Sequence, residues 1–184
     1  RFSAIVGLEP DVDDWVKWAI SHALPPELIA FIRFRPSLLH DFEATTDLTN
    51  TPSPRTVNNV ARLMQAHLPR ELQYEAFSGA AGEAFAIELV GFLQVYKTLP
   101  DIDRVLADPA GTGCPQDPAT LYALCGALAG KADKATMPSI VEYAKRLPVE
   151  FSVLLITDSV AHNPEVTETQ AFIEWSGANN SVLV

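Results

Sequence analysis

The side chain that stands out chemically is Arg55, which follows a serine and a proline at the expected start of a helix. Ser53 is a suitable N-cap because its hydroxyl can accept a hydrogen bond from a backbone amide of the next turn. Pro54 suits the first helical position, where a missing N–H costs nothing. The helix dipole disfavours a cation in the first turn by about 0.3–1 kcal/mol, so a basic residue is unexpected there. A guanidinium beside free amide donors would form a pocket for an anion such as phosphate.

Local spacing also leaves an ordinary interpretation of Arg55 open. An arginine in a first turn can be solvated, or it can pair with a nearby carboxylate, since the dipole penalty is small. The segment after it has one apolar face, because the following residues recur at helical spacing: Val57, Val60, Ala61, Met64 and Leu68. The spacing therefore predicts a packed helix, whatever Arg55 does.

No other group of residues forms a recognisable catalytic or metal-binding pattern. The four histidines are scattered, and none has another ligand type at the spacing of a zinc site. His40, Asp41 and Glu43 form the nearest cluster, and a surface loop accounts for them. Cys114 and Cys125 have no histidine nearby, which favours burial over nucleophilic use. There is no Gly-x4-Gly-Lys-Ser/Thr run. We expect no metal site, and no hydrolysis by this chain alone.

The composition indicates an acidic globular protein. Asp and Glu number 23 against 13 Lys and Arg, which gives a net charge of −10 over 184 residues. This balance disfavours nucleic acid or an anionic membrane as a partner. No apolar run reaches the roughly 18 residues that span a bilayer. Two cysteines are too few for a disulfide scaffold, so we expect reduced thiols and a cytoplasmic location.

Hydrophobic periodicity predicts an all-α chain of about ten helices with one short strand at residues 2–8. The strand has no evident partner strand in the rest of the sequence. Residues 84–99 are apolar nearly all round, so we expect the central helix there. The small residues at 78–82 are expected to lead into it, and residues 108–118 to form a linker. The helical segments are expected at 11–23, 27–34, 54–68, 69–77, 84–99, 101–107, 119–131, 136–147, 148–162 and 165–177.

The Ser-Pro-Arg sequence at 53–55, after a pair of helices and a loop, resembles the sensor-2 motif in the helical lid of AAA+ ATPases, particularly the MoxR-like group. Arg1-Phe2, followed by a short β run and Glu9-Pro10, resembles the end of the last core strand in that family, where an arginine before phenylalanine commonly serves as the arginine finger. Further stretches resemble the lid of bacterial and phage ATP-binding proteins of this type: 15–19, 31–39, 78–83 and 92–96.

The resemblance implies a division of the chain into three parts. Residues 1–8 would be the remnant of an ATPase core strand, and residues 9–107 a helical lid that contains the sensor-2 helix. Residues 108–184 would be a helical C-terminal extension packed on the lid. Because the sequence begins with arginine instead of methionine, we expect it to be a fragment whose Walker motifs lie in an N-terminal core.

The resemblance also implies roles for individual residues. Arg55, next to Pro54, would contact the γ-phosphate of ATP bound with Mg²⁺ by the core of its own subunit. Arg1 would reach the nucleotide of the neighbouring subunit in a homo-oligomeric ring. Such arginines stabilise charge on the transferred phosphoryl group. The family typically remodels a partner protein in a chaperone-like manner. The alternative is a stand-alone helical adaptor that binds a protein partner through an apolar groove.

Overall fold

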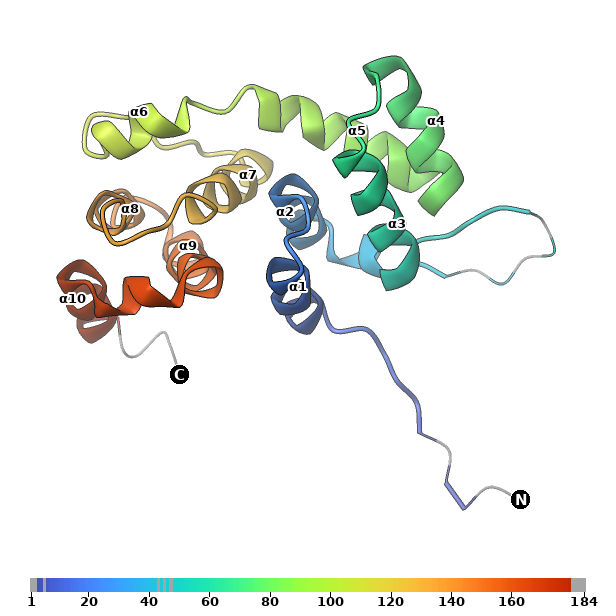
Figure 1. Ribbon diagram of the computed structural model, residues 1–184, viewed down its shortest axis with the longest axis horizontal. Helices are drawn as coiled ribbons and strands as arrows, with labels where there is room; N and C mark the ends of the chain where they lie inside the picture. Colours follow the sequence, from blue (N-terminus) through green and yellow to red (C-terminus); the bar gives the residue numbers. More distant parts are fainter. Residues whose placement is uncertain (1–2, 5, 43, 45, 47, 180–184) are drawn as a thin grey trace.

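The structure is a computed structural model that describes residues 3–4, 6–42, 44, 46 and 48–179. Over these residues it is all-α, as the periodicity predicts, with ten α-helices and two short 3-10 helices (Figure 1). The elements are α1 (Val12–Ser21), α2 (Pro26–Phe34), η1 (Pro36–Leu39), α3 (Pro54–Gln65), α4 (Arg70–Ala81), α5 (Glu83–Lys97), α6 (Ile102–Ala107), α7 (Pro118–Ala129), α8 (Met137–Ala144), α9 (Val149–His162), η2 (Pro164–Glu168) and α10 (Gln170–Ala178).

The expected strand at residues 2–8 is wrong. Residues 3–4 and 6–8 form no strand, while Phe2 and Ile5 lie outside the described residues. Residues 6–8 lead away from α1 (Figure 1), with Val6 79% and Leu8 92% exposed. The physical reason is the lack of a partner: every regular element of the described chain is a helix, and one strand cannot satisfy its own backbone.

Two hydrophobic clusters organise the helices. The first joins α1 to α5 around Phe31, Phe85 and Leu89, and the second joins α6 to α10 around Tyr143 and Trp175. The two clusters meet where α2 packs along α7. Figure 1 shows the resulting arrangement, with the amino-terminal helices at one end of the molecule and the carboxy-terminal helices at the other.

The helix expected at the centre, residues 84–99, is not central. One face of α5 is buried through Phe85, Ala86, Leu89 and Phe92, whereas Ile87 is 56% exposed. The most enclosed helices are α2, in which residues 28–32 are all buried, and α7. The reason is position: α2 packs against α1, α5 and α7, whereas the apolar surplus of α5 lies on the outside of the molecule.

The helix expected at residues 69–77 is longer than its sequence pattern suggests. It continues as α4 through Gly79 to Ala81, and the break comes at Gly82. Gly82 has φ +97°, and a Cβ at this position would lie 2.8 Å from the carbonyl oxygen of Asn50. Only glycine fits this turn without strain, so Gly82 both separates α4 from α5 and lets the end of the 41–53 loop approach them.

Candidate functional site

The start of α3 is fixed by a capping box. The backbone N–H of Thr56 donates to Oγ of Ser53 (3.3 Å), and the backbone N–H of Ser53 donates to Oγ1 of Thr56 (2.8 Å). The Thr56 hydroxyl is also within 2.9 Å of the Thr51 carbonyl oxygen, to which it can donate. Ser53 is therefore the N-cap and Pro54 the first helical residue, as predicted.

The rest of α3 anchors this start to the molecule. Val57, Val60 and Ala61 are fully buried in the first hydrophobic cluster. Arg55 lies on the opposite side and is exposed. The helix therefore presents the guanidinium to solvent from a backbone that both its cap and its buried face hold in place.

The free amide donors expected beside Arg55 are mostly engaged. The Thr56 amide donates to the Ser53 hydroxyl, and the Val57 amide donates to the Ser53 carbonyl at 2.9 Å. Pro54 has no N–H, so only the Arg55 amide lacks an acceptor among the described residues. Of the free amides predicted beside Arg55 only its own remains, because the cap uses the Thr56 amide and the Val57 amide makes an ordinary helical bond. The group able to hold an anion here is the guanidinium.

A hollow of about 710 Å³ lies beside this helix start. Arg55, Pro54 and Thr51 line one side, and His40 and Phe42 belong to the loop that enters α3. Within the described part of the chain, no carboxylate lies within 4.0 Å of the Arg55 guanidinium. The interpretation of Arg55 as a paired surface arginine therefore has no support among these residues.

Further observations concern Arg1, the cysteines, and possible metal-binding and membrane-spanning segments. Arg1 lies outside the described residues. Over the described ranges, no group of three or more His, Cys, Asp or Glu side chains could hold a metal ion. Cys125 is buried, and burial raises the pKa of its thiol to about 12, which makes it unreactive. Cys114 is half-buried. None of the helices described is long and apolar enough to cross a membrane.

Sequence reasoning missed a buried ion pair between Arg33 of α2 and Asp158 of α9. Nη2 of Arg33 lies 2.6 Å from Oδ1 of Asp158, and the side chains are only 15% and 7% exposed. Burial raises the pKa of Asp158 to about 6 and outweighs the opposing effect of the Arg33 charge. Asp158 is a lone charge in an apolar stretch, and Arg33 lies between the apolar residues Ile32 and Phe34; this is the signal the sequence offered. Their pairing across 125 positions was not visible in it.

Comparison of the chain with protein-family models, with curated proteins and with solved structures finds no match. The resemblance to the AAA+ lid therefore depends on the residues around Arg55 and stays a prediction.

Proposed function

We propose that this chain is the lid portion of a MoxR-like AAA+ ATPase, in which Arg55 contacts the γ-phosphate of ATP held with Mg²⁺ by an N-terminal core of the same subunit. The observation that carries the proposal is an exposed guanidinium with no carboxylate partner among the described residues, on a helix that is capped and anchored. A guanidinium is suited to this role because its planar donors match phosphate oxygens and its charge is permanent.

The packing of α3 also favours a coupling role. Because Val57, Val60 and Ala61 are buried with side chains of the neighbouring helices, Arg55 can move a long distance only together with the first cluster. A γ-phosphate that attracts Arg55 would therefore draw the whole lid toward the nucleotide, and its loss would release the lid. In the same proposal Arg1 is the arginine finger toward the next subunit of a ring, and the work is remodelling of a partner protein.

The test uses the protein encoded by the complete gene. Arg55→Ala should lower ATP turnover at least about tenfold, because a lost charge-stabilising donor costs that much or more. Arg62→Ala is the matched control: it removes an exposed arginine from the same helix, away from the hollow, and should leave turnover unchanged.

Equal turnover in Arg55→Ala and Arg62→Ala would contradict the proposal. The gene itself gives a second test, since Walker A and B motifs upstream of Arg1 are required. A start codon directly before Arg1, with no such motifs, would favour the stand-alone adaptor instead.

A further inference from the structure

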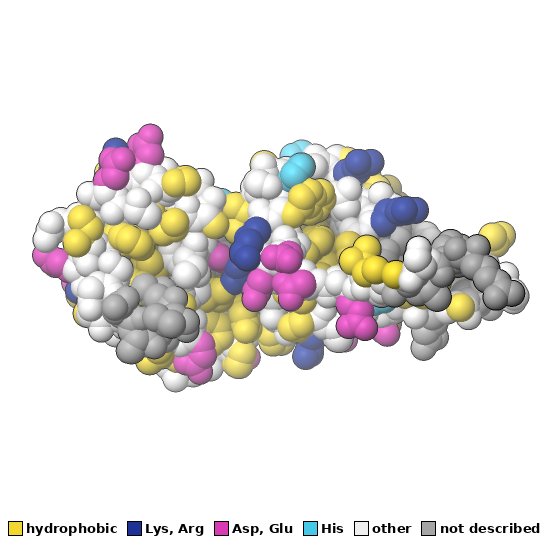
Figure 2. Space-filling view, turned by 90° about the horizontal axis from the view of Figure 1, so that it is seen from below, with side chains coloured by type: hydrophobic (Ala, Val, Ile, Leu, Met, Phe, Trp, Pro, Cys, Tyr) yellow, Lys and Arg dark blue, Asp and Glu magenta, His cyan; other side chains and the backbone are white. Residues whose placement is uncertain are grey.

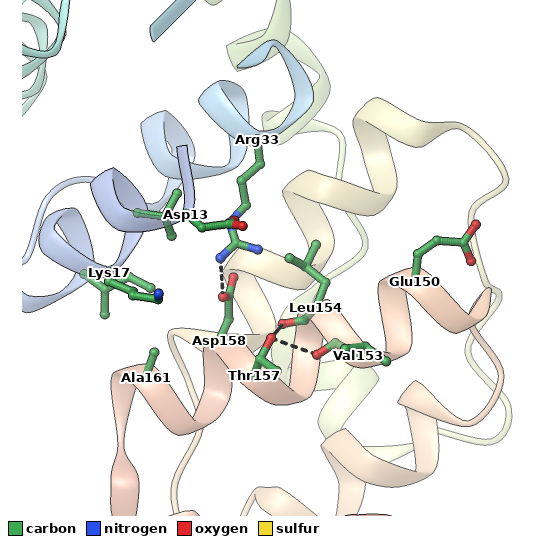
Figure 3. A pocket seen from close by; sticks show the side chains of 11 residues that line it. Asp13, Lys17, Arg33, Glu150, Val153, Leu154, Thr157, Asp158 and Ala161 are labelled. Atoms are coloured by element: carbon green, nitrogen blue, oxygen red, sulfur yellow. Dashed lines mark hydrogen bonds and ion pairs between the residues drawn. The ribbon is translucent and has the colours of Figure 1, made fainter. Parts of the chain in front are cut away.

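A groove of about 420 Å³ runs along one face of α9, opposite α1, with α2 at its base (Figure 3). The lining residues of α9 are spaced as one helical face: Glu150, Val153, Leu154, Thr157, Asp158 and Ala161. Eleven residues of helix separate the first from the last, a length of about 16 Å or three turns. The lining residues of α1 also follow helical spacing: Asp13, Val16, Lys17 and Ile20. The two helical ridges border the groove on either side, and a third helix could pack between them.

Five of the eleven residues that line the groove are apolar, and the other six are polar or charged. Val16 is buried, and Ile20, Val153 and Leu154 are half-buried along its length. At the base, the Arg33–Asp158 pair joins α2 to α9, and Figure 3 shows the guanidinium directed at the carboxylate. In the view from below, hydrophobic side chains and adjoining basic and acidic ones lie where the surface narrows between the two ends of the molecule (Figure 2).

The side chains that line the groove carry a net charge of −1, because three acids (Asp13, Glu150 and Asp158) stand against two bases (Lys17 and Arg33). Arg33 is paired with Asp158, and Lys17 lies 3.4 Å from the carboxylate of Asp14. Asp13 and Glu150 are the lining acids that remain, and neither has a cation within 4.0 Å among the residues described. Both belong to the first turn of their helices, where the helix dipole favours a negative charge.

We propose that this groove docks a basic amphipathic helix of a partner protein. The apolar side chains of that helix would lie along Val16, Ile20, Val153 and Leu154, and its Lys or Arg side chains would pair with Asp13 and Glu150. This is the helix-in-groove mode of recognition, in which anchors at i, i+3, i+4 and i+7 fill an apolar channel. An acidic or neutral helix fits less well because it leaves the two carboxylates without a counter-charge.

The test is selection from a phage-displayed library of random peptides about 16 residues long, which as helices would exceed the length of the groove. The 184-residue chain is the bait. Enriched peptides should carry apolar residues at helical spacing and at least one Lys or Arg beside that stripe. Two groove variants should each weaken the binding of the enriched peptides at least about tenfold. Asp13→Lys would repel the basic side chains of the peptide, and Ala161→Arg would block the end of the groove near the C-terminus of α9.

Matched controls lie outside the groove. Glu71→Lys makes the same charge change in the first turn of α4, and Ala84→Arg adds the same bulk to an exposed position of α5. Both should bind the enriched peptides as the unmodified chain does, and acidic peptide variants should regain affinity for Asp13→Lys. The proposal is overturned if no peptide is enriched, if the enriched ones are acidic or unpatterned, or if groove and control variants bind alike. It is also overturned if the chain dimerises through this face and Ala161→Arg dissociates the dimer. The readout is peptide binding, so it is independent of the role of Arg55.

Discussion

At the scale of single residues, the Arg33–Asp158 pair is the most deeply buried ion pair among the described residues. Asp158 has a folded-state pKa of about 6 against an ordinary value of 3.8, chiefly because it is buried. The folded protein therefore binds more protons than the unfolded chain between these two values. The stabilisation from this group is fully present below pH 3.8 and is lost as pH rises toward 6, by about 3 kcal/mol in total.

This reasoning predicts the effect of two substitutions on stability. Between about pH 4 and pH 6, the ionisation of Asp158 lowers the unfolding free energy of the unmodified protein. Asp158→Asn should remove this contribution, because asparagine does not ionise. Arg33→Met should instead make the unfolding free energy fall more steeply with rising pH. It should also lower the unfolding free energy by about 3–5 kcal/mol near neutral pH, because it leaves a buried carboxylate without its partner. Urea denaturation across this pH range measures both effects. Asp14→Asn, at an exposed carboxylate, serves as the control and should keep the original slope. An unchanged slope in Asp158→Asn would show that Asp158 does not titrate in this range.

At the scale of elements, two glycines of the α4–α5 region should respond oppositely to alanine. Gly79 lies inside α4 with nothing within 4 Å of its missing Cβ, so Gly79→Ala should raise the unfolding free energy by about 0.5–1 kcal/mol. At Gly82, φ is +97° and the Cβ would meet the Asn50 carbonyl at 2.8 Å. Gly82→Ala should therefore lower the unfolding free energy by more than about 1 kcal/mol. Thermal unfolding of the two variants tests this, and a stabilised Gly82→Ala would contradict the described turn.

The helices show what sequence could and could not predict. The periodicity and caps of α3 and α9 are local properties, so their positions followed from the sequence within a few residues. The prediction that α5 is the central helix was wrong. Burial depends on which neighbouring helices pack against each face, and the apolar content of a helix alone does not say where those neighbours lie. The prediction of a strand at residues 2–8 was wrong for a similar reason. β-propensity is a local property, but a strand also needs a partner strand elsewhere in the chain.

At the scale of the whole molecule, two hydrophobic clusters meet along α2 and α7. Arg55 and its hollow lie at the start of α3, whose buried face packs in the first cluster, whereas the groove between α1 and α9 lies where helices of the two clusters come together. The sequence indicated the Arg55 site because its cap, proline and arginine are adjacent. The groove could not be found in this way, because its two ridges are more than 100 positions apart in the sequence.

Nucleotide affinity is the direct test of the proposed contact between Arg55 and the γ-phosphate. In the full-length protein, Arg55→Ala should weaken binding of a non-hydrolysable ATP analogue by about tenfold to a hundredfold, the effect of one charged hydrogen bond. Binding of ADP, which lacks the γ-phosphate, should stay the same. Equal effects on the two nucleotides, or none on either, would contradict the claim.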